Sequence, residues 1–243
     1  MQKQAKLTLL VILLFLGSFF AESAAQNNDR KFNLSFNINY TTTAKLYLNP
    51  KSSDEITRNN YMPLEKIVSP SLDIRYNITD EFIVGLSTEY LKKTAIMPDL
   101  LVASPRGTMA LEVEDGFKLI PVEISAYYLL PFSSETFKLY MGGGLAYYYG
   151  EQIRKFSDVE VSNLHRDFAY GIQFSIATDY MLTKFLSMRG EMKFRDPEFE
   201  VTSQYNRKSI VYQNQTIFIT QNSFISKINV DGITFTFGLA LHF

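Results

Sequence analysis

The sequence predicts an all-β protein, namely a closed antiparallel up-and-down transmembrane β-barrel of eight strands that follows a cleaved signal peptide. Three observations support this fold class: eight segments alternate apolar and polar residues, short and long links alternate between them, and the N-terminus carries a secretion signal. Alternation with a period of two indicates a strand that has one face in an apolar medium. Short turns on one rim and long loops on the other are typical of transmembrane β-barrels.

The N-terminal segment has the three parts of a secretory signal peptide. Residues 1–6 carry two lysines, residues 7–20 are almost wholly apolar, and residues 23–25 are the small residues of a cleavage site. The alternative is an uncleaved anchor, but the apolar run is shorter than the about 20 residues that a spanning helix needs. We therefore expect a signal peptide at 1–25 and a barrel domain at 26–243.

The composition excludes several classes of protein. The net charge of −1 offers no basic surface for nucleic acid. The absence of cysteine removes disulfides, thiolate metal sites and a cysteine nucleophile. Fifteen tyrosines and twenty phenylalanines, with no tryptophan, favour strands. No spanning helix is predicted after residue 25, so the mature chain is either water-soluble or a β-barrel.

The last predicted strand shows the alternation most clearly. Large apolar side chains occupy every second position of residues 233–243, and small or polar residues lie between them. One face of this strand is therefore apolar along its whole length. The apolar residues that we assign to it are Phe235, Phe237, Leu239, Leu241 and Phe243.

Seven further segments repeat this pattern. Each is close to the ~9–11 residues that a tilted strand needs to cross a membrane. Since both chain ends then lie on the rim with the short turns, the number of strands must be even, and eight satisfies this condition. The seven segments are residues 32–40, 72–78, 82–90, 122–130, 141–149, 168–180 and 186–194.

The links between these strands alternate between tight turns and long polar segments. Within the last long segment, residues 209–212 and 216–220 predict a short hairpin. We favour an extension of the wall above the membrane over an extra pair of spanning strands, which would make ten. The short links are residues 77–81, 131–136 and 182–184, and the long ones are residues 42–62, 92–116, 150–167 and 195–231.

The charged residues on the second face of the strands bear on whether the barrel is soluble or membrane-bound. A soluble barrel also alternates but turns its apolar face inward, so the pattern alone does not decide. Aromatic residues near both strand ends match interfacial girdles, and an apolar strand at the chain end would be an exposed edge in water. In a membrane barrel these charges point inward and must pair. They are Asp73, Arg75, Glu89, Glu123, Asp179, Arg189, Glu191 and Lys193.

Three segments resemble a known family. Residues 232–243 are similar to the C-terminal signal by which the barrel-assembly machinery recognises its clients, and residues 120–131 and 139–149 resemble two strands of the small OmpA/OmpW-type barrels. The resemblance implies an eight-stranded barrel in the outer membrane of a Gram-negative envelope, and an assembly signal in the last strand. It implies no single activity, because such barrels include adhesins, anchors, small-solute channels and a few enzymes.

Two non-enzymatic functions follow from the inward charges. If the three cations Arg75, Arg189 and Lys193 pair with Glu89, Glu123 and Glu191, the lumen is plugged and the barrel is a structural or surface-binding protein with long external loops. If pairing is incomplete, a porin-like channel for small solutes or ions results. We favour the plug, because eight strands leave little internal room. The partners that we expect are membrane lipid, the barrel-assembly machinery, and an unidentified extracellular ligand or solute.

A barrel hydrolase is the third hypothesis, and the histidine content makes it the weakest. His165 lies beside Asp167 without a serine in the arrangement that a lipid deacylase needs, and His242 lies on the inward face near the chain end. Acidic clusters at 112–115 and 158–160 are better explained as solvated loops than as cation sites. We therefore expect no catalytic residue, metal site or cofactor.

The membrane assignment predicts a folded barrel that resists dodecyl sulfate without heating. The full chain should fractionate with the outer membrane and migrate differently on gels before and after boiling, because a closed strand ladder unfolds only on heating. A periplasmic protein whose mobility does not change on boiling would contradict the assignment.

Overall fold

Strands form nearly the whole of the described chain. The computed structural model describes residues 30–104, 107–157, 159–207, 209–212, 215–218 and 223–243, so the predicted signal peptide lies outside the described residues. The elements are β1 (Phe32–Tyr47), α2 (Glu55–Asn59), β2 (Met62–Asn77), β3 (Phe82–Glu89), β4 (Leu91–Ser104), β5 (Gly107–Leu129), β6 (Phe137–Phe156), β7 (Val159–Arg166), β8 (Ala169–Met181), β9 (Leu186–Arg195), β10 (Glu198–Tyr205), β11 (Ser209–Tyr212), β12 (Gln215–Phe218), β13 (Ser223–Asn229) and β14 (Ile233–His242).

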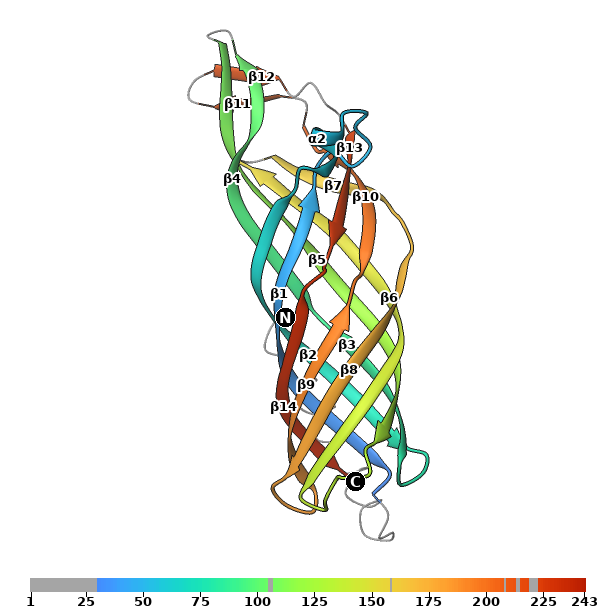
Figure 1. Ribbon diagram of the computed structural model, residues 1–243. Coiled ribbons are helices and arrows are strands. Elements are labelled where there is room, and N and C mark those ends of the chain that lie inside the picture. Colours follow the sequence, from blue (N-terminus) through green and yellow to red (C-terminus); the bar gives the residue numbers. More distant parts are fainter. Residues whose placement is uncertain (1–29, 105–106, 158, 208, 213–214, 219–222) are drawn as a thin grey trace, which may run out of the picture.

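The half of the molecule that contains the C-terminus, drawn at the bottom of Figure 1, is a closed antiparallel barrel. We call it the lower barrel. Its hydrogen-bonded ladders run in the order β1, β2, β3, β5, β6, β8, β9 and β14. Strand β14 returns to pair with β1 from Asn33↔His242 to Thr41↔Thr234. The predicted eight strands and the predicted closure are confirmed, and the lower barrel has no open edge, as hydrocarbon requires.

The predicted long loops are wrong over most of their length, because strands continue through them. β1 runs to Tyr47, β5 begins at Gly107 and β6 runs to Phe156, while β4, β7, β10 and β13 extend the remaining strands upward. Charged and amide residues occupy the outer face of these extensions, so the sequence suggested solvated loops. β11 and β12 pair only with each other, so the predicted hairpin and the count of eight spanning strands rather than ten are confirmed. The hairpin is a separate two-stranded sheet, however, and not the predicted extension of the wall.

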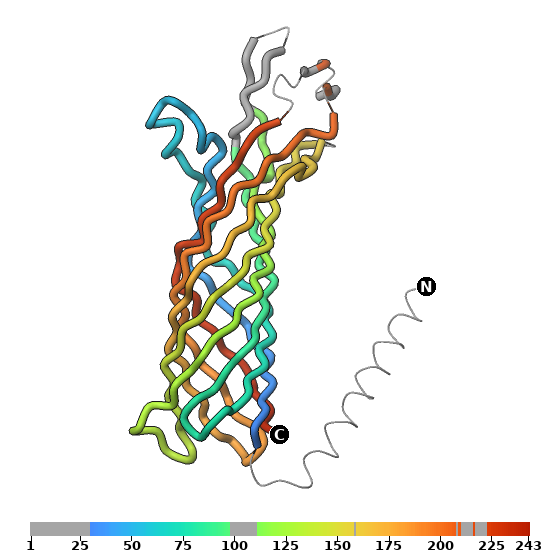
Figure 2. Tube along the Cα trace, turned by 90° about the vertical axis from the view of Figure 1, so that its right-hand side faces the viewer, coloured from blue at the N-terminus to red at the C-terminus, as the bar shows by residue number. Residues whose placement is uncertain are grey.

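Above the lower barrel the wall divides into two sheets, as Figures 1 and 2 show. One sheet is β2-β1-β13-β10-β7 and the other is β4-β5-β6. Between β6 and β7 only two residue pairs join the sheets, at Lys155↔Glu160 and Phe156↔Val159. No ladder joins β2 to β4 in the described chain. We call these interruptions the β6/β7 seam and the β2/β4 seam.

Strands β1 and β2 exchange their inner and outer faces without a change of register. Thr41 pairs with Ile67 and Thr43 pairs with Glu65, while Thr42 and Lys66 between them are left out of the ladder. Lys66 has a φ of 56°, in the left-handed region. One irregular residue in each strand changes which side chains point inward beyond it, because successive side chains of a strand alternate between its two faces. Below this irregularity β1 points polar residues into the lumen, whereas above it β1 points Ala44 inward, which is fully buried.

The upper interior is consequently an apolar core packed between the two sheets. Such packing stabilises the upper half as in a water-soluble sandwich. The sequence did not predict this core, because the inward charges of the spanning strands led us to expect a charged lumen along the whole barrel. Its members are Ala44, Leu46, Met62, Leu64, Ile67, Leu91, Phe117, Leu119, Ala146, Tyr148, Ala169, Phe199, Val201, Ile228 and Val230.

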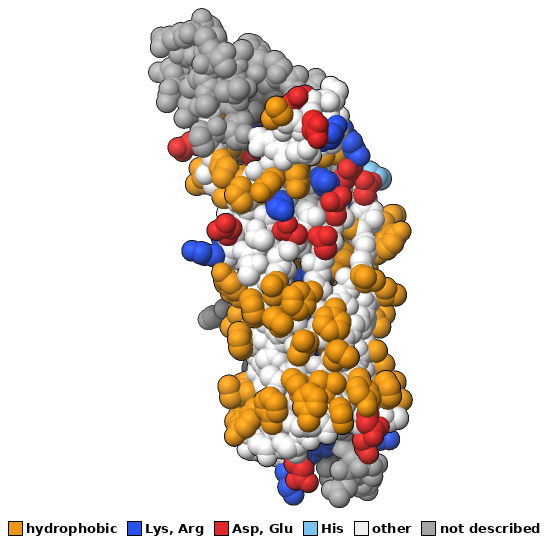
Figure 3. Space-filling view, in the orientation of Figure 1, with side chains coloured by type: hydrophobic (Ala, Val, Ile, Leu, Met, Phe, Trp, Pro, Cys, Tyr) orange, Lys and Arg blue, Asp and Glu red, His pale blue; other side chains and the backbone are white. Residues whose placement is uncertain are grey.

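The outside of the lower barrel is an apolar belt. Ile38, Ile124 and Leu145 are 63%, 66% and 69% exposed, and Figure 3 shows hydrophobic side chains covering this region on the face in view. Charged side chains gather above it in the same figure. Water-soluble monomers do not expose so large an apolar surface, so the belt is the face toward lipid. No described helix is long and apolar enough to span a membrane.

Gly142 shows how closely the lower lumen is filled. A Cβ at this position would lie 2.3 Å from Cδ1 of Tyr127, whereas at Gly190 the nearest atom would be Cγ2 of Thr178 at 3.5 Å. We expect Gly142→Ala to lower the free energy of unfolding by about 1–3 kcal/mol through overpacking, and Gly190→Ala to change it much less. Urea unfolding in detergent, read by the gel shift, measures both. Equal effects of the two substitutions would contradict this account of the lumen.

Candidate functional site

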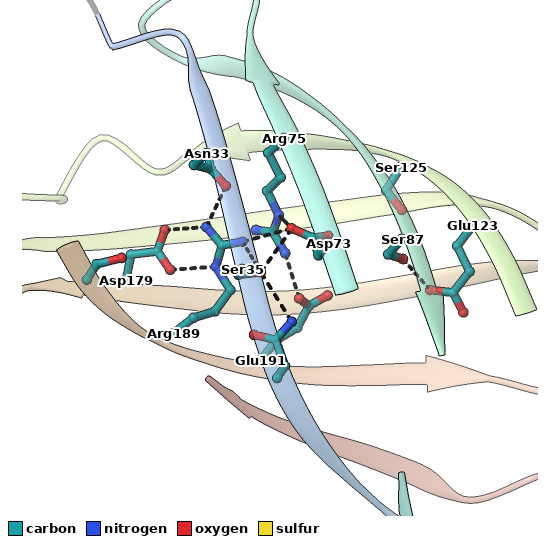
Figure 4. A network of polar contacts seen from close by, with 12 residues as sticks. Asn33, Ser35, Asp73, Arg75, Ser87, Glu123, Ser125, Asp179, Arg189 and Glu191 are labelled. Atoms are coloured by element: carbon teal, nitrogen blue, oxygen red, sulfur yellow. Dashed lines mark hydrogen bonds and ion pairs between the residues drawn. The ribbon is translucent and has the colours of Figure 1, made fainter. Parts of the chain in front are cut away.

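Five buried charged side chains form the lower layer of the lumen network (Figure 4). Arg75 donates from Nε to Asp73 Oδ1 at 2.8 Å and from Nη2 to Glu191 Oε2 at 2.7 Å. Arg189 donates two hydrogen bonds to Asp179, at 2.7 and 2.8 Å. A third bond, from Arg189 Nη1 to Asp73 Oδ1 at 2.8 Å, links the two arginines through one carboxylate. The layer therefore connects opposite sides of the barrel.

Four more charged side chains form the upper layer, nearer the long-loop rim. Arg195 donates to Glu123 Oε1 at 2.9 Å and to Glu89 Oε2 at 2.6 Å. Lys193 forms an ion pair with the other oxygen of Glu123. Ser69 donates a hydrogen bond of 2.5 Å to Glu89. Each carboxylate of this layer thus has at least two donors, as charges removed from water require.

The strand pattern explains how the network assembles. On β9 the alternate residues from Arg189 to Arg195 all point into the lumen, and every one of them is charged. Arg189 lies directly opposite Asp179 of the neighbouring β8 in the register, so this ion pair is a cross-strand pair. The other partners come from β2, β3 and β5 across the lumen, because a barrel of eight strands is narrow enough for side chains to meet.

The structure places every predicted lumen residue inside the barrel, and none of them is more than 8% exposed. The predicted pairing was only partly right. Glu89 pairs with Arg195, which the sequence analysis had placed in a long link. The signal that could have found Arg195 is its position two residues beyond Lys193, which continues the charged alternation of β9. Asp73 pairs with both Arg75 and Arg189, and neither of these pairs was predicted.

Aromatic rings and the apolar core fill the rest of the space around the two charged layers. The Arg75 guanidinium lies 3.9 Å from the centroid of the buried Tyr127 ring. The cavity between the two charged layers has a volume of only about 10 Å³, which is room for about one water molecule. Above the upper layer lies the apolar core. The lumen therefore holds an ionic segment inside the membrane and an apolar core directly above it, and buried polar pairs such as Gln152 with Ser203 lie beyond that core.

A larger open cavity lies on the outer surface at the long-loop rim. Its volume is about 570 Å³, within the range of small-molecule sites. The segment between β1 and β2 forms one wall, and the outer faces of β10 and β13 form the other. We call this cavity the rim groove. Its lining residues are Leu48, Asn49, Pro50, Lys51, Ser52, Thr57, Thr202, Ser223, Phe224 and Ile225.

The two histidines lie at opposite ends of the barrel and have different partners. His165 Nε2 lies 3.2 Å from Asp167 Oδ1, and both side chains are exposed. His242 Nε2 lies 2.8 Å from Ser187 Oγ at the short-turn rim. Of the predicted acidic loop clusters, Asp115 is buried and pairs with Arg154 at 3.1 Å. No group of three metal-ligating side chains is close enough to hold an ion among the described residues.

The residues of the predicted assembly signal lie on the lipid face of β14. Phe237, Leu239 and Leu241 are exposed, and Phe243 stacks on Phe32 with ring centroids 6.2 Å apart. Backbone hydrogen bonds of 2.9 Å join these two phenylalanines in both directions at the point of closure. The geometry explains a structural role in closing the barrel, and recognition of this strand by the barrel-assembly machinery stays a prediction.

Solved structures with this fold are outer-membrane proteins. OprG from Pseudomonas aeruginosa superposes with a TM-score of 0.61 at 14% identity, over 88% of this chain and 95% of that chain. The Neisserial surface protein NspA, at 14% identity over 87% and 97% of the two chains, has a TM-score of 0.46. AlkL, at 13% identity over 90% and 92%, also has 0.46. TM-scores of 0.46 are too low to support an inference. No protein-family model and no curated protein matches the sequence.

The closed strand ladder, the apolar belt and the polar lumen define an outer-membrane β-barrel. The fold is that of the small eight-stranded barrels, as the resemblance in the sequence implied. The chain is therefore an integral protein of the bacterial outer membrane, with its short turns on one side and its two-sheet extension on the other.

The upper layer predicts an unequal cost for breaking two ion pairs. We expect Arg195→Met to lower the free energy of unfolding by about 3 kcal/mol or more, because Glu89 and Glu123 lose a buried partner. Lys155→Met, which breaks the exposed pair with Glu160, should cost less than about 1 kcal/mol. Urea titrations in detergent measure both. Adding Glu89→Gln to Arg195→Met should restore part of the loss, and equal costs for the two single variants would contradict the prediction.

Proposed function

We propose that this protein is a sealed outer-membrane anchor that presents a rigid binding surface at the long-loop rim. Two blocks in the lumen are the observation that carries the proposal. The charged layers fill the membrane segment, and the apolar core fills the part of the extension next to it. A continuous water path would have to open both, and the packed side chains of the apolar core offer water no hydrogen-bonding partner. The polar side chains buried beyond this core, Gln152, Ser203 and Ser226, are hydrogen-bonded to one another.

The rim groove supports the binding part of this proposal. Its wall between β1 and β2 is held in place rather than left free. Lys51 Nζ pairs with Glu200 Oε2 of β10 at 2.7 Å. Asp54 caps the short helix α2 by accepting a hydrogen bond of 2.8 Å from the Thr57 amide, and the bonds from Thr57 hold the pKa of Asp54 below its usual value. A preformed groove of this size loses little entropy when a ligand binds.

Passage of a small solute through the wall is the second candidate function, and the β6/β7 seam favours it. Between Tyr148 and Lys155, β6 has no ladder partner on this side. The side-chain amide of Asn163 bridges the seam with two hydrogen bonds of 3.1 Å to the backbone of Gln152. The seam is thus closed by side chains, Asn163 on Gln152 and Arg166 on Glu151, and not by a backbone ladder. Packed core residues lie behind it, so we place this function second.

Conductance of the purified full chain in planar bilayers tests the seal. We expect no current steps above the leak, because neither block leaves a path for ions. Glu123→Gln should also stay silent, since it removes one charge of the upper layer but leaves the apolar core intact. A swelling assay on proteoliposomes extends the measurement to uncharged solutes, and there too the wild type should match empty liposomes.

Two results would overturn the seal. Discrete steps well above the leak that change in Glu123→Gln would show that ions pass the charged layers. Solute entry that rises in Asn163→Ala, but not in the matched Asn206→Ala, would instead favour passage through the seam. Asn206 is a matched control because its side chain also bonds a backbone group, the amide of Glu160, but at the tip of the β6–β7 hairpin.

A further inference from the structure

We propose that the outer face of β4, β5, β6 and β7 binds the phosphate groups of a lipid headgroup in the membrane leaflet beside the long-loop rim. The site is a row of three cations and one carboxylate, Lys92, Lys118, Glu151 and Arg166, which we call the basic row. This inference rests on the location of the barrel in the membrane and is independent of the proposed seal and rim groove.

The strand register aligns the basic row at one height. Lys92 lies directly opposite Lys118 on β4 and β5, and Lys118 lies opposite Glu151 on β5 and β6. Arg166 of β7 reaches across the β6/β7 seam and donates to Glu151 Oε1 at 2.8 Å. Lys118 Nζ lies 3.4 Å from the other oxygen of Glu151. Glu151 therefore holds two cations at a fixed spacing.

Two lysines in directly opposing positions repel each other unless an anion lies between them. Lys92 is exposed and has no ion-pair partner in the described part of the chain. Lys118 and Arg166 remain 30% and 35% exposed while they share a single carboxylate. The row carries three positive charges and one negative charge, hence a net charge of +2. An anion that approaches the basic row from outside would neutralise this excess charge.

The height of the row matches the headgroup region of the membrane. Immediately on the membrane side lie Tyr90 and Tyr149, which are 44% and 40% exposed. The Arg166 guanidinium lies 5.1 Å from the Tyr149 ring centroid, and Lys118 Nζ lies 5.9 Å from that of Tyr90. Interfacial tyrosines lie at headgroup level, so cations just above them meet lipid phosphates. A position at headgroup level matters for a lipid phosphate but not for an anion dissolved in water.

The opposite sheet provides the contrast. Two of its outward lysines, Lys45 and Lys227, are each matched by one carboxylate. Lys45 pairs with Asp231 at 2.5 Å, and Lys227 pairs with Glu198 at 3.3 Å. Both lysines also lie over tyrosine rings, as those of the basic row do. Three cations that share one carboxylate are thus a feature of the β4–β7 side, which points to a localised lipid site.

Native mass spectrometry of the full chain in detergent micelles doped with bisphosphorylated lipid A tests the proposal. We expect one lipid A bound to the wild type, and roughly 20-fold weaker binding in Lys92→Gln/Lys118→Gln, since two cations near an anionic surface are lost. The matched control, Lys45→Gln/Lys227→Gln, should bind as the wild type does. Lys92→Arg/Lys118→Arg should retain binding, and the gel shift verifies that each variant is folded.

Three outcomes would overturn the proposal. Equal loss in both glutamine variants would show that only overall charge matters. Undiminished binding of dephosphorylated lipid A would show that acyl chains, and not phosphates, are recognised. Displacement of lipid A by millimolar inorganic phosphate would make the row a site for free anions. None of these outcomes changes the expected conductance, so a failure here is distinct from a failure of the proposed seal.

Discussion

The buried charges of the lower lumen must find partners inside the barrel, and the rest of the structure depends on that constraint. Arg189, joined to both Asp179 and Asp73, ties β9 to β8 and to β2 across the lumen. Breaking one such pair leaves a charge without water or partner, which costs far more than an exposed pair is worth. The network therefore keeps the barrel narrow and its strands in one register, and this rigidity supports the extension above.

The extension solves a different problem with the same strands. Outside the membrane the outer face meets water, so the apolar residues must turn inward. β1 and β2 achieve this with the unpaired Thr42 and the left-handed Lys66, one irregular residue in each strand. β5 keeps its alternation and changes residue type instead, from Glu123 to Leu119 and Phe117 on the same inner face. One chain thus forms an inverted barrel in lipid and an ordinary sandwich core in water.

The proposed functions are divided between the interior of the barrel and its outer surface. The filled interior supports an anchor rather than a pore, and the outer surface carries the features that are open to partners: the rim groove, the two seams and the basic row. The seams follow from the division into two sheets, since a sandwich needs no continuous ladder. Lys92, Lys118 and Glu151 of the basic row lie on the smaller sheet between the two seams, and Arg166 joins them from β7 across the β6/β7 seam.

The sequence by itself determined the fold class, the eight strands, their closure and the inward position of the lumen charges, because a period of two assigns each side chain to one face. It could not determine which charges pair, since Arg195 and Glu89 are far apart in the sequence and meet only across the lumen. It also missed the apolar core, because one irregular residue in each of β1 and β2 reverses the two faces of these strands without changing their period. Only the tertiary structure decided the packing of the interior, the seams and the row of cations, because each is made by several strands rather than by one.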